Sequence, residues 1–354
     1  MARERAEILI IGGGIAGLST AYHLASHGQK GIVVLDREPV PGFYASGHNA
    51  GIGRQLTGRA EHTALTVEGT GRLRSAGLMD NGGGCLLGAD SGGTQSLAEE
   101  AAAFSLNVRR GAGSPFPELK AEEHLEIPSD GVIDVDRMLA YCAEGGRAQG
   151  VSLRFGWNVR SLSPSGAGME VETDRGPIQA DLVVNAAGAW CGELGRMAGG
   201  LDLAFKPLRR HLVWSNHPWP EHRRWAWWAD RPLYLRPESG GLLLCACEEQ
   251  ETPLPPLHTQ LGNDDSILTG LDGSLNELAP ALANVPIARL WCGLRTFAPD
   301  RRFVIGFDPL NPRLYWVAGL GGHGMTSGLA VGQLAAQSIL RHRPTHELDP
   351  ARFL

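Results

Sequence analysis

The chain of 354 residues predicts an α/β fold, α+β overall, with two domains. The first observation is an apolar run at 7–11 that passes through closely spaced glycines into a helical pattern, as in a parallel-sheet domain. The second is a similar buried run at 180–190, far along the chain, which makes that domain discontinuous in sequence. The third is a series of strands at 207–245 with a hairpin-type turn, which indicates a second domain with a mixed or antiparallel sheet.

The first strand and helix carry a dinucleotide-binding signature. Gly12-x-Gly14-x-x-Gly17 follows the apolar run and opens the helix. Gly12 permits a tight turn, Gly14 lets the backbone approach a pyrophosphate, and Gly17 lets helix pack on strand, while free amides at the helix start face the anion. The next apolar strand ends in Asp36, 19 positions after Gly17, at the spacing that lets a carboxylate hold ribose hydroxyls. The signature predicts a Rossmann-like domain for FAD or NAD rather than NADP.

Two further glycine-rich segments have the composition of ligand-lining loops. The segment 37–54 is too irregular for a strand and too polar for a core, and Ser46, His48 and Asn49 within it can hydrogen-bond to a flat ring. The segment 319–327 should place its backbone amides, with the start of the next helix, against the N1–C2=O edge of a flavin, where reduction adds negative charge. Ordinary surface loops are the competing interpretation of both segments.

The remaining elements follow from periodicity and from the turn residues between them. Strands are expected at 31–36, 82–88, 151–155, 168–173, 180–190, 207–214, 232–237, 241–245, 303–306 and 314–318, and helices at 60–76, 94–107, within 115–128, from 137 with Asp134 or Asp136 as N-cap, at 274–283, and from Gly328 to about Arg341 with Thr326 or Ser327 as N-cap. We expect Trp219, Trp225, Trp227 and Trp228 to pack in a core or lid. The expected cofactor domain comprises 1–76, 130–204 and 296–354, and the expected substrate domain comprises 77–129 and 205–295.

Composition excludes several classes of function. The net charge of −6 leaves no basic footprint for nucleic acid, and no run of about 18 apolar residues would cross a membrane. No signal-peptide pattern precedes the first strand, so we expect a cytoplasmic protein. The six cysteines lack metal-ligand spacing and should be reduced, mostly buried thiols, and no metal is expected.

Five segments together resemble the D-amino acid oxidase/DadA-like family of flavoenzymes. They are the N-terminal fingerprint, Ser46–Gly51, Val184–Trp190, Trp291–Thr296 and Gly321–Met325. The chain looks most like D-arginine dehydrogenase and is also similar to glycine and sarcosine oxidases. The resemblance implies FAD bound in a discontinuous domain, with a sheet-bearing substrate domain over the flavin. Fingerprint, loops and resemblance together give the expected cofactor-binding residues Gly12, Gly14, Ile15, Ala16, Gly17, Asp36, Arg37, Ser46, Gly47, His48, Asn49, Ala50, Gly51, Val159, Ala187, Gly188, Trp190, Gly322, His323, Gly324, Met325 and Thr326.

The resemblance also implies a carboxylate clamp made of Arg295, Tyr234 and one of Arg209 and Arg210. A guanidinium offers a planar fork to a carboxylate, and a phenol adds a neutral donor. Strand alternation lets only one of Arg209 and Arg210 face the pocket, and the D-arginine dehydrogenase pattern favours Arg210.

The chain departs from its relatives at three points. It has no carboxylate at 84–87 for a substrate guanidinium, which argues against D-arginine, and it has Ile52 where D-arginine dehydrogenase has a histidine. The cysteine that binds flavin covalently in sarcosine oxidases would match Gly293, whereas Cys292 should point to the other strand face. We therefore expect non-covalent FAD.

These features predict FAD-dependent oxidation of the C–N bond of a small or apolar amino acid, which is a D-amino acid, glycine or an N-substituted glycine. Hydride transfer to flavin N5 would give an imine, and hydrolysis would give the 2-oxo acid and ammonia or an amine. His48 and His323 are the candidate catalytic groups, as proton acceptors for the amine rather than as an obligatory base. Oxygen or a quinone-type molecule would accept the electrons. An NAD-dependent dehydrogenase and a non-catalytic FAD-binding scaffold are the alternatives.

Overall fold

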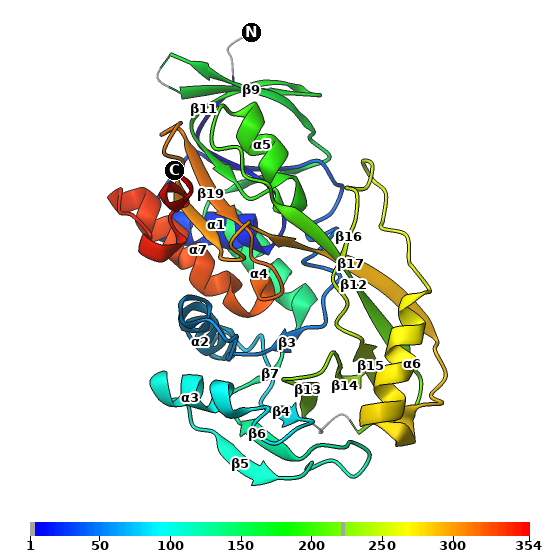
Figure 1. Ribbon diagram of the computed structural model, residues 1–354. Helices are drawn as coiled ribbons and strands as arrows, with labels where there is room; N and C mark the ends of the chain where they lie inside the picture. Colours follow the sequence, from blue (N-terminus) through cyan, green and yellow to red (C-terminus); the bar gives the residue numbers. More distant parts are fainter. Residues whose placement is uncertain (1–3, 167, 221–223) are drawn as a thin grey trace.

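The computed structural model of the protein describes residues 4–166, 168–220 and 224–354. In this part of the chain, two large sheets lie at opposite ends of the molecule, with a group of helices between them (Figure 1). The strands are β1 (Glu4–Ile11), β2 (Ile32–Asp36), β3 (Ile52–Gly53), β4 (Gly84–Gly88), β5 (Arg109–Ala112), β6 (Glu123–Ile127), β7 (Gly131–Val132), β8 (Ser152–Phe155), β9 (Val159–Ser165), β10 (Gly168–Thr173), β11 (Gly176–Asn185), β12 (Lys206–Ser215), β13 (Trp225–Trp228), β14 (Tyr234–Glu238), β15 (Gly241–Cys245), β16 (Gln250–Glu251), β17 (Arg289–Phe297), β18 (Val304–Phe307) and β19 (Leu314–Ala318). The helices are α1 (Ile15–Ser26), α2 (Ala60–Ser75), α3 (Gln95–Ala103), α4 (Val135–Ala148), α5 (Cys191–Met197), α6 (Ile267–Leu278) and α7 (Gly324–Arg341).

The first sheet has the strand order β18-β19-β11-β1-β2-β8 and is parallel from β8 to β19. Its central strands are buried on both faces, as Leu9 and Ile10 of β1 show, which explains their unbroken apolar sequences. From β1 the chain passes to β2 and β8 on one side, and later to β11 and β19 on the other. The order therefore reverses between β1 and β11, and open parallel sheets bind ligands at the carboxyl ends of the strands at such a point.

The second sheet has the order β16-β12-β15-β14-β13-β4-β6-β5, with β17 also paired to β12. It is mixed because β13 runs parallel to β4, whereas the other pairs are antiparallel. Two chain segments, 84–127 and 206–297, supply its strands. We propose a substrate domain of 77–129 and 205–295, and β17 continues past its boundary at 295 to Phe297.

The helices bring the two ends of the chain together. Helices α1 and α7 pack side by side at the centre of the molecule, with α2 and α4 beside them (Figure 1). The packing of α7 on α1 is so close that a Cβ on Gly332 would lie 2.1 Å from Ser19 Oγ. The first and last helices are thus fixed to one another beside the carboxyl ends of the first sheet.

Two predicted helix features are wrong. The segment 115–128 contains no helix but the strand β6, because Leu125 and Ile127 alternate with polar residues and are buried against β4. Helix α7 begins at Gly324 and not at Gly328, with His323 as its N-cap in place of Thr326 or Ser327.

The early start of α7 follows from where its first hydrogen bonds go. The Ser327 amide donates to the His323 carbonyl at 2.9 Å, so the first helical turn is already closed there. The Ser327 hydroxyl donates to the same carbonyl, and the Thr326 hydroxyl donates to the Ile52 carbonyl at 3.2 Å. Both residues therefore lie within the first turn of α7, C-terminal to the N-cap position.

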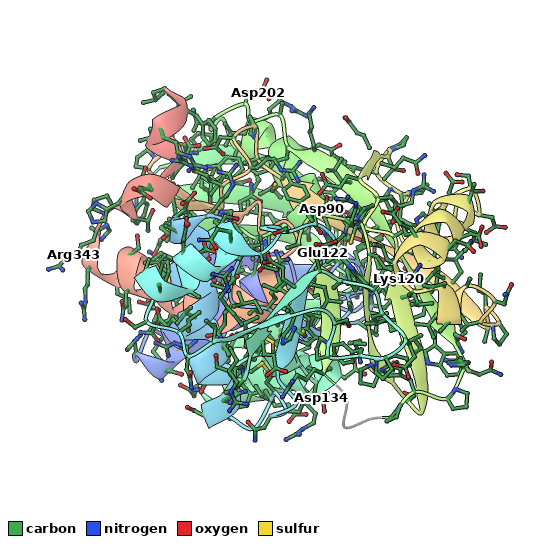
Figure 2. The ribbon with its side chains drawn as sticks, turned by 60° about the horizontal axis from the view of Figure 1, so that its bottom comes forward. Asp90, Lys120, Glu122, Asp134, Asp202 and Arg343 are labelled. Carbon is green, nitrogen blue, oxygen red and sulfur yellow. The ribbon has the colours of Figure 1, made fainter. Side chains whose placement is uncertain are left out.

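The described ranges show no membrane-spanning helix, no metal-ligating cluster and no disulfide. Within them no helix is long and apolar enough to cross a membrane, and no cluster of His, Cys, Asp or Glu could hold a metal ion. The cysteines are free thiols, of which all but Cys247 are buried. Exposed charges of both signs, including Asp90, Lys120 and Arg343, are spread over the outside of the molecule (Figure 2).

Candidate functional site

Two connected cavities lie where the first sheet faces the second. The strand-end cleft is lined by the carboxyl ends of β1 and β2 and by the turn after β11. The inner cavity is lined by the loop 45–54, by β12, β14 and β17, and by the loop 318–326. Gly14, Ser46 and Leu294 line both cavities, so the two form one elongated space.

The glycine fingerprint forms the floor of the strand-end cleft. Gly12 has φ +123°, and a Cβ there would lie 2.1 Å from the Ala186 carbonyl oxygen at the end of β11. A Cβ on Gly17 would lie 2.0 Å from the Gly12 carbonyl oxygen. Gly14 is less crowded and faces the cleft, with a Cβ position 3.1 Å from Ser46 Oγ. The backbone therefore meets the cleft without intervening side chains, as a pyrophosphate requires.

The wall of the strand-end cleft is set by residues at the end of β2. The Asp36 carboxylate accepts hydrogen bonds from the amides of Gly13 at 2.6 Å and Glu38 at 2.7 Å. Burial raises the pKa of Asp36, and these two amides oppose that change. The Arg37 guanidinium carbon lies 3.9 Å from the ring centroid of Trp190. These contacts fix a carboxylate and a flat cation–aromatic wall where a nucleoside would lie.

The loop after β19 delivers free amides to the inner cavity. Gly319 and Gly321 have φ of +70° and +51°, which turns the chain from β19 into α7. The first-turn residues Gly324, Met325 and Thr326 line the cavity, and first-turn amides have no acceptor within their own helix. This edge of the cavity suits negative charge.

The arginines of the predicted clamp lie on neighbouring strands. The register of β12 with β17 pairs Arg210 with Gly293 and Leu208 with Arg295. Side chains alternate along a strand, so Arg210 and Arg295 emerge on the same face, and Gly293 leaves space between them. Both line the inner cavity, together with Tyr234 of β14. The structure thus brings all three predicted substrate-binding residues together.

Arg209 points away from the cavity, as alternation predicts. Its guanidinium donates to the Gly262 carbonyl at 3.0 Å and to the Thr252 hydroxyl at 3.3 Å. Arg210 donates from Nε to the Glu248 carbonyl at 2.7 Å, while its Nη1 is buried without a hydrogen-bond partner. Arg210 therefore retains donor capacity for a ligand.

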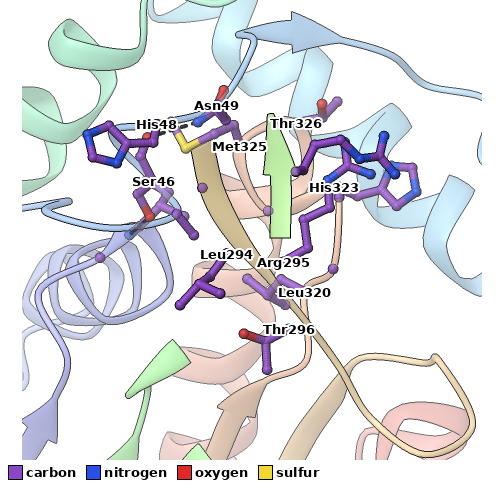
Figure 3. A pocket seen from close by; sticks show the side chains of 18 of the residues that line it. Ser46, His48, Asn49, Leu294, Arg295, Thr296, Leu320, His323, Met325 and Thr326 are labelled. Atoms are coloured by element: carbon purple, nitrogen blue, oxygen red, sulfur yellow. Dashed lines mark hydrogen bonds between the residues drawn. The ribbon is translucent and has the colours of Figure 1, made fainter. Parts of the chain in front are cut away.

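Burial sets the protonation of the polar groups in the inner cavity. It raises the pKa of Tyr234 well above its ordinary value, so the phenol is a neutral donor. It lowers the pKa of His48, and it lowers that of His323 further with help from Arg54, His62 and Arg295. His48 lies beside Ser46 at one side of the cavity, whereas His323 lies beside Arg295 at the other (Figure 3). Both imidazoles are neutral at pH 7, and His323 is the weaker proton acceptor.

Nearly all the predicted cofactor-binding residues line one of the two cavities. The strand-end cleft contains Gly12, Gly14, Asp36, Arg37, Ser46, Val159, Ala187, Gly188 and Trp190. The inner cavity contains Ile15, Ala16, His48, Asn49, Ala50, Gly51, Gly322, His323, Gly324, Met325 and Thr326. Gly17 and Gly47 line neither; Gly17 packs on Gly12, and the Gly47 amide donates to the Gly42 carbonyl at 2.8 Å. Both shape the loops that hold the site.

Sequence reasoning missed two residues that line the inner cavity. Arg54 follows Ile52 by two positions in extended backbone, so both side chains point into the cavity, a signal that alternation could have given. Trp227 was predicted to pack in a core or lid, but it lines the cavity and holds the Arg54 guanidinium carbon 4.1 Å from its ring centroid. The other three tryptophans, Trp219, Trp225 and Trp228, are buried core residues.

The joined cavities fit a dinucleotide flavin. The cleft crosses the switch point of a doubly wound sheet over glycines that tolerate no Cβ, and the inner cavity adds a helix N-terminus and a cationic wall. Fold and site together define a dinucleotide-binding protein with an adjoining chamber lined by arginines. The chain belongs to the FAD dependent oxidoreductase family, whose model matches residues 7–338. FAD, and not NAD, is therefore the cofactor.

Similar proteins share this fold over nearly the whole chain. Mitochondrial dimethylglycine dehydrogenase of Rattus norvegicus is 29% identical over 395 aligned positions, which cover 99% of this chain and 45% of that protein. L-proline dehydrogenase from P. horikoshii has a TM-score of 0.86 at 23% identity, covering 99% of this chain and 98% of its own. Glycine oxidase from Bacillus cereus ATCC 14579 has a TM-score of 0.81 at 18% identity, covering 97% of each chain. The chain thus spans less than half the length of the mitochondrial relative.

Proposed function

We propose that the protein oxidises the C–N bond of a small amino acid or N-substituted glycine to an imine, which water hydrolyses to a 2-oxo acid and ammonia or an amine. The observation that carries the proposal is the clamp of Arg210, Arg295 and Tyr234 within the chamber that adjoins the cofactor cleft. FAD supplies the hydride acceptor when it is bound. The names of the similar proteins, which include dehydrogenases of dimethylglycine and proline, support this class of substrate.

The residues of the inner cavity would bind and orient the substrate rather than abstract its α-hydrogen. The guanidinium groups would pair with the carboxylate, and the neutral Tyr234 phenol would donate one more hydrogen bond to it. Such fixing of the reacting carbon supplies much of the rate in hydride transfer, provided that the amine is neutral. Because burial lowers the pKa of both His48 and His323, these imidazoles would take a proton from the amine only weakly.

The direct test is anaerobic mixing of the purified flavoprotein with glycine, sarcosine, proline and D-alanine while the visible flavin bands are followed. Bleaching by any of these amines supports the proposal, and its rate ranks the substrates. A flavoprotein that no amine reduces, although dithionite does, would favour the non-catalytic scaffold. Where an amine does reduce the flavin, reoxidation of the reduced flavin by oxygen or by a quinone would identify the electron acceptor.

We also propose that FAD is held non-covalently. Gly293 has no side chain to attach it, and Cys292 directs its thiol toward the carbonyls of Leu261 at 3.7 Å and Gly262 at 3.5 Å. Acid precipitation should release all flavin into the supernatant. A yellow pellet would contradict this proposal.

A further inference from the structure

The inner cavity adjoins an outer cavity, and three arginines are among the residues that line both. The outer cavity lies between the β13–β14 turn, at 228–232, and the loop 247–249. These are Arg54, Arg210 and Arg295, and Trp227, Gly322 and His323 also line both cavities.

Two of these three cations lack a paired carboxylate in the described residues, and the third shares its partner. Within the described residues, neither Arg54 nor Arg295 has a carboxylate at ion-pair distance, and Arg54 Nε is buried without a hydrogen-bond partner. Arg210 approaches Glu249 only at 3.6 Å, and Glu249 is already paired with Arg301 at 2.8 and 2.9 Å. A buried charge without a partner is costly, so a site that keeps such charges is built for an anionic ligand.

Internal acids do not neutralise Arg54. Asp130 and Glu100 act on it only from beyond ion-pair distance, and the Asp130 carboxylate accepts hydrogen bonds from the backbone and side-chain amides of Gln55. Burial lowers the pKa of Arg54 to about 10, which leaves it charged at neutral pH.

Arg54 is held in place by stacking rather than by hydrogen bonds. Its guanidinium lies over the ring of Trp227, and Trp227 in turn lies 4.5 Å from the ring of Tyr234. Stacking uses the flat face of the guanidinium and leaves the N–H edge free for bidentate binding. Arg54 is thus directed at the same space as the clamp.

The charge of the outer cavity favours the same kind of ligand. Five arginines line it against two acids, Asp230 and Glu249, although the whole chain has a net charge of −6. A cavity of one sign concentrates ligands of the opposite sign and raises their association rate. A single carboxylate would occupy the clamp of Arg210, Arg295 and Tyr234 and leave Arg54 unpaired.

We propose that the substrate is a dicarboxylic amino acid whose second carboxylate pairs with Arg54. The second carboxylate would be carried either by the α-side chain, as in aspartate or glutamate, or by the N-substituent, as in iminodiacetate. This inference rests on the proposed function and narrows its substrate class. It replaces the apolar substituent expected from sequence, because an apolar group would leave Arg54 without a counter-charge.

Binding of unreactive ethers to the oxidised holoenzyme tests the second carboxylate without turnover. Oxydiacetate carries two carboxylates and methoxyacetate carries one, and shifts of the flavin spectrum report the Kd of each. We expect oxydiacetate to bind at least tenfold more tightly, which is about 1.4 kcal/mol. Arg54→Gln should remove that preference and leave the Kd of methoxyacetate within about threefold.

Arg231→Gln is the matched control, because Arg231 lines the outer cavity but is paired with Asp90 at 2.7 Å and Glu277 at 3.4 Å. It should keep the preference of the wild-type protein. If Arg54→Gln does not retain FAD, the wild-type protein still decides the matter, since equal Kd values for the two ethers together with equal reduction rates for glutamate and alanine overturn the proposal.

Anaerobic reduction rates separate the two sources of the second carboxylate and the two proposals. Faster reduction by iminodiacetate than by sarcosine places the carboxylate on nitrogen, whereas faster reduction by D- or L-glutamate than by alanine places it on the side chain.

Reduction by monocarboxylates with no advantage for either dicarboxylate overturns this inference and keeps the proposed function. Tight oxydiacetate binding without reduction by any amine keeps this inference and overturns the proposed function. An equal loss of rate for both classes in Arg54→Gln, with a changed flavin reduction potential, would assign Arg54 to the flavin and overturn the inference.

Discussion

The strand-end cleft and the inner cavity are built by different parts of the polypeptide. The cleft is made by backbone, in which Gly12, Gly14 and Gly17 bring a strand and a helix closer than side chains allow. The inner cavity is made by long side chains, with Arg210 and Arg295 placed by the register of two strands about 80 positions apart in sequence. The first region should therefore tolerate almost no added atoms, whereas the second should tolerate changes of side chain at a cost in substrate binding alone.

The largest effect should come from adding one methyl group to the cleft. Gly12→Ala puts a Cβ at a position 2.1 Å from the Ala186 carbonyl oxygen and forces an alanine to φ +123°. Because the backbone at both positions would have to move, we expect the variant to lose FAD, with a loss of several kcal/mol in unfolding free energy. The measurements are the ratio of flavin to protein absorbance and the Tm.

Gly28→Ala is the control for that variant. Gly28 also has a positive φ, +88°, but a Cβ there would meet no atom within 4 Å. It should cost about 1 kcal/mol and keep FAD in full. Equal losses of FAD and of Tm in the two variants would show that these losses come from backbone strain and not from the close approach of β1 to β11.

The second effect should be confined to the inner cavity. Arg295→Leu removes one of the two guanidinium groups of the proposed clamp, and each charge-assisted hydrogen bond is worth about 1.5–3 kcal/mol. We expect kcat/KM to fall by about 100-fold or more, with FAD content and Tm close to those of the wild-type protein. Arg209→Leu, on the other face of the same sheet, should keep kcat/KM within about threefold; an unchanged value in Arg295→Leu would remove Arg295 from the site.

A smaller effect should appear in the part of the inner cavity that is made by backbone, the loop before α7. Gly322→Ala places a Cβ 3.0 Å from Arg295 Nη1, so the guanidinium must shift, and we expect KM to rise about tenfold with little loss of FAD. Gly324→Ala is the matched control, since its Cβ would make an ordinary contact of 3.4 Å with Leu320. A loss of FAD in Gly324→Ala, or an unchanged KM in Gly322→Ala, would break the distinction between backbone and side-chain roles in this loop.

The smallest effect concerns the neutral histidines. Because burial lowers the pKa of His48 and His323, neither should gain or lose a proton between pH 7 and pH 10. The rate of flavin reduction should rise with pH in this window as the substrate amine becomes neutral. His48→Ala and His323→Ala should reach a plateau at high pH within about tenfold of the wild-type rate. Abolished reduction at that plateau would mean that one imidazole is an obligatory base.

The same contrast explains which features could be predicted from sequence. Gly12 and Asp36 belong to a local pattern whose spacing encodes its geometry, so the cleft and the parallel sheet were predictable. The prediction that Arg210 and not Arg209 faces the cavity required the family resemblance together with strand alternation. Arg54 was missed because its role depends on Trp227, which reaches it from β13, a strand that was not predicted.

The two wrong helix predictions have a related cause. Residues 123–127 are rich in acids and suit a short helix, but pairing with β4 makes them a strand, so tertiary contacts override the local preference. The hydroxyls of Thr326 and Ser327 have the chemistry of N-caps, yet α7 starts at Gly324 because the chain turns at Gly319 and Gly321. Neither the strand at 123–127 nor the start of α7 can be predicted from the local sequence alone.

The packing of α7 on α1 also constrains the order in which the protein can assemble during synthesis. Strand β1 and helix α1 leave the ribosome before the other elements, but β11, which pairs with β1, follows about 170 residues later and α7, which packs on α1, about 300 residues later. Pairings so distant in sequence slow folding, because loop closure precedes the contacts that stabilise it. The apolar faces of α1 therefore stay unburied until most of the chain has been made. Early binding of FAD to the glycine loop cannot complete the site before α7 has been synthesised.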